Sequence, residues 1–281
     1  MREFSISSGR CGNEPLGKRF FEEATKNGFK AVEILITPAH FRAAPEEICR
    51  ARKMAADCGV KINSVHCDME ILDPPSLDIF RKAKERLLAN LDAARDLGAE
   101  ILVIHAYVFA PPEIVMVDDD GGLHPGFTVF RGLEDEKSGM LERVQDGMAF
   151  YAQEAKKRGV AIALETDTQK NECLMQLIEK ADPRYCGICF DTGHAQIQKD
   201  AVEFARLLAP RVICTHLHDN DGKKDLHLAP FRGIIDWYRL IRELLRAGYK
   251  GDITFESWDD MRLIVAAREK ISSILRQKIW K

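Results

Sequence analysis

One pattern recurs eight times along the chain: a short run of apolar and β-branched residues, a polar loop, and a stretch with apolar residues at helical spacing. The strand-like runs cover residues 3–7, 31–36, 61–66, 100–105, 160–165, 187–191, 211–218 and 252–257. Strict alternation of strands and helices requires a parallel sheet with helical crossovers, and eight units match a closed barrel better than an open sheet. The expected fold class is therefore α/β, a single (β/α)8 TIM barrel that forms one domain over residues 1–281.

One connection departs from this repeat, because residues 106–139 separate the fourth strand from the next helical stretch. The segment contains glycines, prolines and the consecutive acids Asp118, Asp119 and Asp120. Loops of this length are usually functional or disordered. We therefore expect a long loop insertion after the fourth strand, which is either a solvated decoration or a lid over an active site.

The composition disfavours two classes of partner. Lysine and arginine number 41 against 44 acidic residues, so the formal net charge of −3 provides no overall attraction to nucleic acid or to an anionic membrane. No stretch approaches the roughly 20 apolar residues of a membrane span, and the N-terminus lacks the apolar core of a signal peptide. We expect a soluble, cytoplasmic protein that does not bind membranes.

The cysteines are scattered, and several lie within apolar strand-like runs. This distribution suits reduced, buried thiols better than a disulfide framework. The Cys-x-x-Cys pair, Cys186 and Cys189, lies on a predicted strand, where the two thiols point to opposite sides. We interpret the pair as structural and not as part of a zinc site.

Polar side chains gather where the predicted strands end, and in a barrel of this type those ends converge on one mouth. A single histidine or carboxylate at a strand end is usually a cap or a hydrogen-bonded core group. Here six successive strands carry a potential metal ligand at or near the end: His66, His105, Glu165, Asp191, His216 with His218, and Glu256. Such a set of imidazoles and carboxylates predicts a site for a divalent ion such as Zn²⁺, Mn²⁺ or Co²⁺.

The stretch FDTGH places Asp191 and His194 three residues apart at the end of an apolar run. We expect Asp191 to be a metal ligand on the sixth strand. His194, just past that strand, should approach the same mouth and bind substrate or a second metal.

Several motifs occur in a characteristic order: LET at 164–166, FDTGH at 190–194, THLHDND at 215–221, DLHLAP at 225–230, GIIDW at 233–237 and FES at 255–257. Their order and spacing resemble the xylose isomerase-like TIM barrel superfamily, in particular its sugar phosphate isomerase and epimerase members. The resemblance covers essentially the whole chain and is most specific between Glu165 and Glu256.

The resemblance implies one divalent metal (Mn, Zn or Co) held by Glu165, Asp191, His216 and Glu256. It also implies that Glu165 and Glu256 act as general base and general acid on opposite sides of a substrate, through an enediolate that the metal stabilises. Redelivery of the proton to the same carbon gives epimerisation, and redelivery to the neighbouring carbon gives isomerisation. The alternative role of the two glutamates is metal ligation alone.

Further roles follow from the same resemblance. His216 is preferred to His218 as the ligand because it precedes Asp219 by three residues, the family's H-x-x-D spacing. Arg232 stands where relatives commonly have an acidic residue between two glycines, so it either binds an anionic group of the substrate or is a solvated surface arginine. The residues expected to bind substrate are His66, His105, His194, His227 and Arg232.

A second family on the same barrel, the zinc-dependent AP endonucleases, holds three metals. This chain has candidates at every corresponding motif, and Asp225 and His227 are the candidates for an extra metal. The net negative charge and the acids within 106–139 argue against a nucleic-acid substrate.

The leading hypothesis is therefore a divalent-metal-dependent isomerase or epimerase that acts on a small sugar, polyol or keto-sugar. An AP endonuclease-like phosphodiesterase, an inosose dehydratase-like lyase and a barrel that binds a sugar without chemistry stay open as alternatives. Homo-oligomer formation through Trp237 and Tyr238 also stays open, beside simple packing of these two residues on the barrel.

Overall fold

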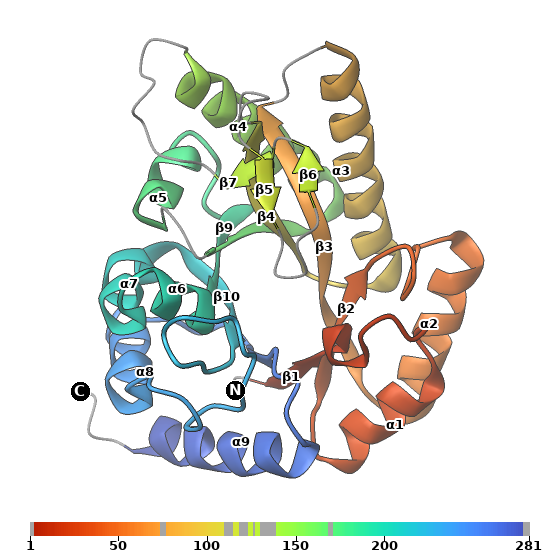
Figure 1. Cartoon of the computed structure of the whole chain (residues 1–281). Coiled ribbons are helices and arrows are strands. Elements are labelled where there is room, and N and C mark those ends of the chain that lie inside the picture. The colour runs from red at the N-terminus through yellow and green to blue at the C-terminus, as the bar shows by residue number, and fades with distance from the viewer. Residues whose placement is uncertain are drawn as a thin grey trace.

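The computed structural model describes residues 3–73, 77–109, 115–117, 123–125, 127–129, 139–167 and 171–277, with side chains for 3–67, 81–105, 139, 141–167 and 171–277. Eight parallel strands follow one another in the order β3-β2-β1-β11-β10-β9-β8-β4, and pairing of β3 with β4 closes the ring (Figure 1). These strands are β1 (Phe4–Ser7), β2 (Ala31–Ile36), β3 (Lys61–Asp73), β4 (Ile101–Phe109), β8 (Ala161–Glu165), β9 (Cys186–Asp191), β10 (Val212–Leu217) and β11 (Ile253–Phe255). The predicted (β/α)8 barrel is confirmed.

Helices surround the barrel and alternate with its strands. They are α1 (Lys18–Lys26), α2 (Pro45–Cys58), α3 (Leu77–Leu97), α4 (Met140–Arg158), α5 (Leu174–Leu177), α6 (Thr192–Gln198), α7 (Ala201–Leu208), α8 (Trp237–Arg246) and α9 (Met261–Arg276), with short 3-10 turns at Ser8–Cys11, Asn171–Cys173 and Ala209–Arg211. The helices α2 and α4 end at glycines, Gly59 and Gly159, which adopt the left-handed conformation.

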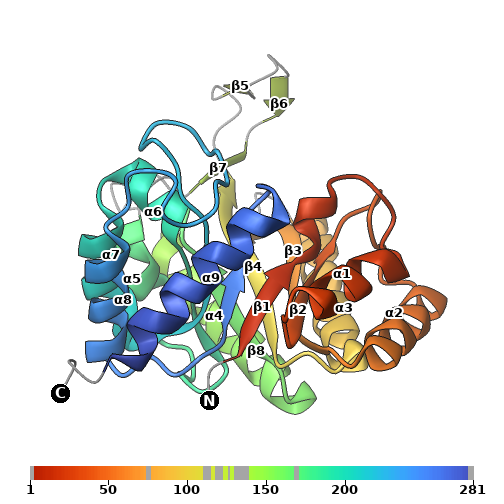
Figure 2. The same ribbon diagram turned by 90° about the horizontal axis from the view of Figure 1, so that it is seen from below.

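The insertion after the fourth strand is more regular than a loop. The sequence places the ends of two strands at His66 and His105, but β3 and β4 continue to Asp73 and Phe109 because they go on pairing beyond the barrel. The segments β5 (Val115–Val117), β6 (Leu123–Pro125) and β7 (Phe127–Val129) follow, and β7 pairs antiparallel with β4. In Figure 2 they stand above the carboxyl ends of the barrel strands, on the same side as α6. The other residues of 106–139 lie outside the described part of the chain, so the lid stays a prediction, as does the single domain over 1–281.

The apolar core has two parts. A large cluster fills the space between strands and helices, and its largest fully buried side chains include Phe21, Phe29, Phe190 and Trp237. A small cluster inside the barrel consists of Val103, Ala163, Cys189 and Cys214. Cys189 of this inner cluster pairs in register with Glu165, so the cluster reaches the polar groups at the carboxyl end of the barrel.

Cys186 and Cys189 confirm the alternation expected of a strand. Cys186 belongs to the outer cluster and Cys189 to the inner one, so the two thiols lie on opposite faces of β9. Burial raises the pKa of Cys186 to about 12. All eight cysteines are free, and five of them are buried, whereas Cys49 is exposed and Cys11 and Cys58 are half-buried.

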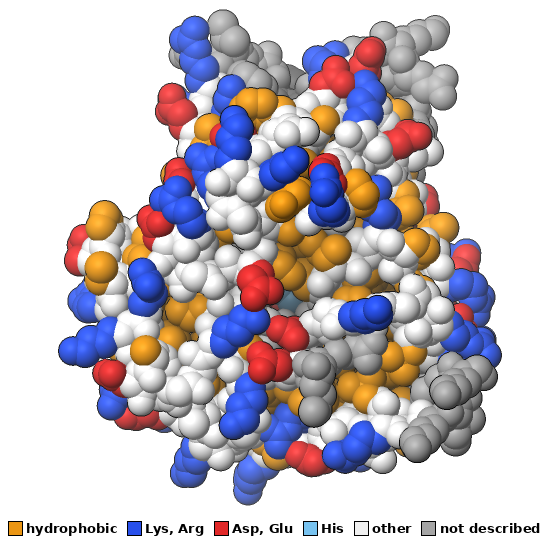
Figure 3. Space-filling model, turned by 180° about the vertical axis from the view of Figure 1, so that it is seen from behind, with side chains coloured by type: hydrophobic (Ala, Val, Ile, Leu, Met, Phe, Trp, Pro, Cys, Tyr) orange, Lys and Arg blue, Asp and Glu red, His pale blue; other side chains and the backbone are white. Residues whose placement is uncertain are grey.

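The described helices include none that is both long and apolar enough to cross a lipid bilayer. Figure 3 looks at the amino ends of the barrel strands, where acidic and basic side chains intermingle around apolar ones. This face carries both signs of charge, in line with the nearly balanced composition.

Candidate active site and metal centre

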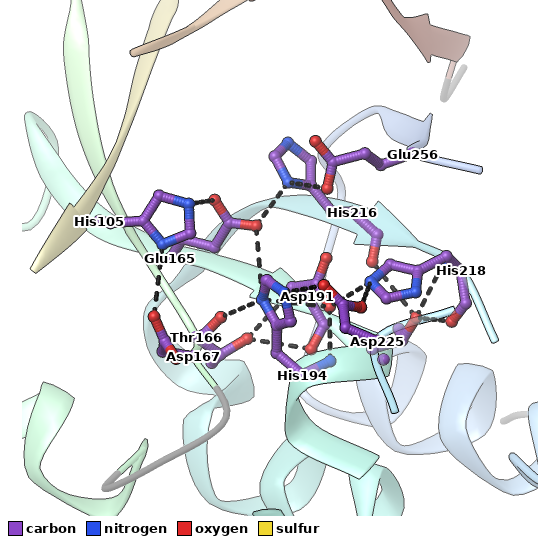
Figure 4. A network of polar contacts seen from close by, with 12 residues as sticks. His105, Glu165, Thr166, Asp167, Asp191, His194, His216, His218, Asp225 and Glu256 are labelled. Atoms are coloured by element: carbon purple, nitrogen blue, oxygen red, sulfur yellow. Dashed lines mark hydrogen bonds and ion pairs between the residues drawn. The ribbon is translucent and has the colours of Figure 1, made fainter. Parts of the chain in front are cut away.

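Four residues from adjacent strands meet inside the carboxyl end of the barrel. Glu165 ends β8, Asp191 ends β9, His216 lies in β10, and Glu256 follows β11. In the sheet register His216 pairs with Asp191, which puts both side chains at the same height. One donor atom from each of the four lies within 4.8 Å of the others, and all four are buried (Figure 4). We call this set the inner group; it is the ligand set that the sequence predicts.

His216 lies at the centre of the inner group. Its Nδ1 is 2.8 Å from Glu165 Oε1 and 3.3 Å from Glu256 Oε2. Its other nitrogen, Nε2, is 3.0 Å from Glu33 Oε2. Glu33 is 1% exposed and was missed by the sequence reasoning. A carboxylate in the middle of the apolar run AVEILI is the sequence feature that could have identified Glu33.

His66 and His105, which the sequence analysis expects to bind substrate, lie beside Glu165. His66 Nε2 is 3.0 Å from Glu165 Oε2, and its Nδ1 is 3.5 Å from Glu256 Oε1. His105 Nε2 is 3.3 Å from the same Glu165 Oε2, and its Nδ1 is 3.5 Å from Asp167 Oδ2. Glu165 therefore has imidazole neighbours at each oxygen: His216 at Oε1, and the two other imidazoles at Oε2.

A second set of donors lies nearer the surface. Asp225 Oδ2 is 3.3 Å from His194 Nε2 and 3.1 Å from His227 Nε2. Asp225 is 38% exposed, whereas both histidines are almost buried. We call His194, Asp225 and His227 the outer group. His227 has a left-handed backbone (φ 43°), and its Nδ1 bonds to the carbonyl oxygen of Glu256 at 2.7 Å, so the loop holds its ring in place.

His218 lies between the two groups. Its ring stacks on His227 with centroids 3.9 Å apart and planes 10° apart, and Trp258 stacks on the other face of His227 at 3.8 Å. An imidazole binds a metal with an in-plane lone pair at about 2 Å. Two nearly parallel rings at this spacing do not point lone pairs at one ion. Of these two rings, His227 is therefore the candidate ligand of the outer group, and His218 has a different set of contacts.

The contacts of His218 include the carboxylate of Asp191. His218 Nε2 lies 2.9 Å from Asp191 Oδ1, and the same oxygen accepts the backbone N–H of His194 as the N-cap of α6. Asp191 Oδ2 is left to face the inner group. Only glycine fits at residue 193, because a Cβ there would come within 1.9 Å of the His218 ring. The FDTGH stretch thus starts a helix and orients a carboxylate at the same time.

Unsatisfied buried atoms show that the inner group fits a cation. Among the described residues, Glu165 Oε2, Asp191 Oδ2 and both nitrogens of His66 have no hydrogen-bond partner. Their contacts are as short as 3.0 Å but lack hydrogen-bond alignment. Buried polar atoms without partners are costly, and a shared divalent ion would satisfy them together. These buried groups could hold a metal, and their mixture of nitrogen and oxygen donors suits Zn²⁺, Mn²⁺ or Co²⁺.

Strong electrostatic coupling perturbs the inner group. Burial would raise the pKa of Glu165, but the imidazoles of His216, His66 and His105 lower it well below the usual value. The pKa of Glu256 is lowered in the same way against its burial by His216 and His66. Conversely, burial would lower the pKa of His66, but Glu165 and Glu256 raise it to about 10. The raised pKa values of His66 and His216 favour protonated imidazoles, whose positive charge would take the place of the charge of a metal ion.

The outer group shows the same pattern. Burial would lower the pKa of His194, but Asp191, Asp225 and Glu165 raise it well above the usual value. The pKa of His227 is raised chiefly by Asp225, again against burial. Burial would raise the pKa of Asp225, and the two imidazoles bring it below its ordinary value.

Arg232 and Trp237 are both held by neighbouring acids. Arg232, expected to bind substrate, is an exposed side chain paired with Asp259 at 2.8 Å. Asp219 is not at the inner group; its carboxylate accepts the indole N–H of Trp237 at 2.8 Å and anchors the following loop. Trp237 is buried and packs on the barrel, while Tyr238 is 56% exposed. Oligomer formation through Tyr238 stays a prediction.

Comparison with known proteins places this geometry in a family. A relative, the uncharacterised protein y4fM of Sinorhizobium fredii, is 28% identical over 77% of this chain and 73% of its own length. Among solved structures, a D-tagatose 3-epimerase-like protein matches with a TM-score of 0.76 and 24% identity over 97% of both chains. D-psicose 3-epimerase of Clostridium cellulolyticum, solved with D-tagatose, gives 0.72 and 19% over 97% of this chain and 99% of its own.

The IOLI protein, solved with a zinc atom, gives a TM-score of 0.71 and 13% identity over 97% of this chain and 96% of its own. At these identities the structural matches establish the fold. The family model described as xylose isomerase-like TIM barrel matches residues 21–277, nearly the whole chain. The chain therefore belongs to the xylose isomerase-like TIM barrel family.

Proposed function

We propose that this protein is a divalent-cation-dependent isomerase or epimerase that acts on a small sugar, polyol or keto-sugar. The observation that carries the proposal is the placement of Glu165 and Glu256 on two sides of the same pair of imidazoles. His216 Nδ1 contacts both glutamates, and so does the ring of His66. Two carboxylates arranged in this way suit a proton acceptor and a proton donor that face a single reacting carbon.

A divalent cation bound by the inner group would supply Lewis-acid stabilisation of the negative charge that develops on oxygen when a proton beside a carbonyl is removed. Glu165, buried and ionised, is suited to accept that proton. Glu256, 7% exposed and also ionised, lies on the other side of the imidazoles and could return a proton after taking one up. His66, His105, His194 and His227 border the same space and offer N–H groups to substrate hydroxyls.

A neutral substrate fits the surroundings better than a phosphorylated one. Arg232 would have to leave Asp259 before it could bind an anionic group. Arg10, in the 3-10 turn Ser8–Cys11 after β1, is paired with Glu23 at 3.1 Å. D-psicose 3-epimerase, solved with D-tagatose, and the D-tagatose 3-epimerase-like protein share this fold, which supports a sugar-like small molecule as the partner.

The test is proton exchange at carbon. The metal-stripped protein would be reloaded with Mn²⁺, Co²⁺ or Zn²⁺ and incubated with a panel of ketoses in D₂O, and NMR would follow loss of the C–H signal and appearance of epimers or aldoses. Deuterium incorporation that requires metal supports the proposal. Binding of a ketose with no exchange for any metal, or loss of water from the substrate, would exclude it.

Glu256→Gln separates proton transfer from ligation, because the amide oxygen keeps a ligand atom but cannot carry the proton. If Glu256 transfers protons, we expect turnover to fall by roughly 10²- to 10⁴-fold while bound metal stays near the wild-type amount. A parallel loss of metal and activity would leave Glu256 as a ligand alone.

One observation favours a second candidate, a phosphodiesterase with several metals. Three sets of possible ligands adjoin one another: His66, His105 and Glu165; the inner group; and the outer group with its neighbour His218. Multinuclear sites of this kind stabilise attacking and leaving oxygens in phosphodiester hydrolysis. Binding of close to three Zn²⁺ per chain, together with cleavage of abasic DNA, would move the assignment to this class.

A further inference from the structure

Glu33 brings a carboxylate from β2 to the inner group, where it contacts His216. It lies in the middle of β2, it is 1% exposed, and its partner in the sheet register is Ser64 of β3. Oε2 of Glu33 accepts the hydroxyl of Ser64 at 2.8 Å and lies 3.0 Å from His216 Nε2. A buried carboxylate is costly unless it has such partners, so its position calls for a function.

The two nitrogens of His216 must do different things when a cation is bound. A neutral imidazole has one N–H donor and one lone pair, and only the lone pair binds a metal. Nδ1 faces Glu165 and Glu256, which belong to the inner group, whereas Nε2 contacts the carboxylate of Glu33. Which nitrogen keeps the proton therefore decides whether His216 can join the inner group.

We propose that Glu33 is a positioning residue that accepts the Nε2–H of His216 and thereby presents the Nδ1 lone pair to the cation. The inference rests on the proposed cation-dependent function and extends it to a residue outside the ligand set. Carboxylates that hold the distal N–H of a ligand histidine fix its tautomer and ring orientation and increase its basicity.

The alternative role of Glu33 is direct ligation. Donor atoms of Glu33, His66, His216 and Glu256 lie within 4.8 Å of one another. The hydrogen bonds assign Oε2 of Glu33 to the positioning role, because it accepts the Ser64 hydroxyl and faces His216 Nε2, whereas Oε1 has no hydrogen-bond partner and is the atom through which direct ligation would occur. A ligand at this place would also use Nε2 of His216 and turn its lone pair away from Glu165 and Asp191.

The test compares metal binding by the full-length wild type, Glu33→Gln and Glu33→Ala, each stripped with chelator and titrated with Mn²⁺ and Co²⁺. Glu33→Gln keeps the side-chain shape, so it preserves a readout if the alanine variant does not fold. The control is Glu243→Gln, another buried carboxylate, which pairs with Arg206 and Arg246 on α7 and α8.

We expect Glu33→Ala to weaken binding by roughly 10- to 100-fold, the usual effect of losing the partner of a ligand histidine, with Glu33→Gln in between and the control unchanged. The stoichiometry and the shape of the Co²⁺ visible spectrum should stay as in the wild type, because the ligands are the same. In the Zn²⁺-loaded protein, the imidazole N–H proton of His216 should be strongly downfield in the wild type and shift upfield in both variants.

Wild-type affinity in both variants would overturn the positioning role while leaving the proposed function intact. Loss of one ligand would overturn it in favour of direct ligation. That outcome would be seen as an altered Co²⁺ spectrum together with a loss of metal affinity as large as that of His216→Ala. A wild-type protein that binds no divalent cation at all would overturn the proposed function together with this inference.

Discussion

The inner and outer groups are built from similar residues but by different parts of the fold. The inner group comes from four adjacent strands whose register is fixed by backbone pairing, and its members are buried. The outer group takes Asp225 and His227 from the connection between β10 and α8, and Asp225 is 38% exposed. A strand end fixes a side chain through the sheet, whereas a loop must fix it through individual contacts.

The difference has a consequence for metal binding. Ligand atoms that are already in place lose little freedom when an ion binds, and those in a mobile or solvated setting lose more. We therefore expect the inner group to bind a divalent cation tightly and the outer group to bind one weakly.

The largest effect is expected from Asp191→Ala, which removes an inner ligand. Loss of a residue that only hydrogen-bonds a metal ligand can weaken metal binding by roughly 100-fold. Loss of Asp191 should weaken it by more than this, and turnover should fall with it. The variant also loses the N-cap of α6, which costs about 1 kcal/mol of stability. Asp200→Ala is the matched control, because Asp200 caps α7 in the same way but lies outside both groups. Unchanged metal content in Asp191→Ala would show that the inner group is not the metal site.

The next prediction concerns how stability depends on pH, with and without a bound metal ion. In the chelated protein the pKa of His66 is raised to about 10. A group whose pKa is raised in the folded state stabilises fully below its unfolded pKa of about 6.5 and loses that contribution as pH rises towards 10. The lowered pKa values of Glu165 and Glu256 make the opposite contribution, which is lost only in acid, below about pH 4.5.

Chelated protein should therefore be most stable near pH 5 to 6. Above pH 6.5 its free energy of unfolding should fall by about 1.4 kcal/mol per pH unit for each proton that is released on unfolding. Metal-loaded protein should show a much smaller decline, because the ion replaces those protons. Urea unfolding at pH 6 and pH 9, with and without metal, measures both curves. Equal slopes for the chelated and loaded forms would contradict the exchange of protons for a cation.

The sequence predicts the inner group well because its information is local. A polar residue at the end of an apolar run lies at the mouth of a parallel barrel whatever the details of packing, which is why Glu165 and Asp191 could be placed. The sequence does not predict that β3 and β4 continue beyond His66 and His105, because their length depends on whether the two strands go on pairing.

Glu33 and His218 show what a single sequence leaves undetermined. In a strand buried on both sides, the pattern does not tell which face points into the barrel, and the irregular register between β2 and β3 is what brings Ser64 opposite Glu33. For His218 the sequence gives a histidine near the mouth, but ring orientation decides between a ligand and a stacking partner. Arg232 likewise depends on Asp259, which is 27 residues away in the chain.

A smaller effect is expected from Asp225→Asn, which addresses the outer group. Any second, weaker equivalent of metal should disappear, because His194 and His227 lose their shared anion. The affinity of the inner group should change by no more than about twofold if the two groups are independent. Calorimetric titration with Zn²⁺ resolves the two steps. A large loss at the inner group would mean that the two groups form one coupled centre, as the multinuclear alternative requires.

The smallest effect is expected from Trp258→Ala, which removes the ring stacked on His227. Trp258 is 57% exposed, so little buried apolar area is lost, and the stability should fall by about 1 kcal/mol, the usual value of an aromatic pair. Trp258→Phe should recover most of this loss, because a phenyl ring can stack in the same place. Inner-group affinity should be unchanged in both variants. A weakened inner group in Trp258→Ala alone would show that the stack of Trp258, His227 and His218 transmits the position of a surface residue to Asp191, and the distinction between a rigid inner group and a loop-borne outer group would no longer hold.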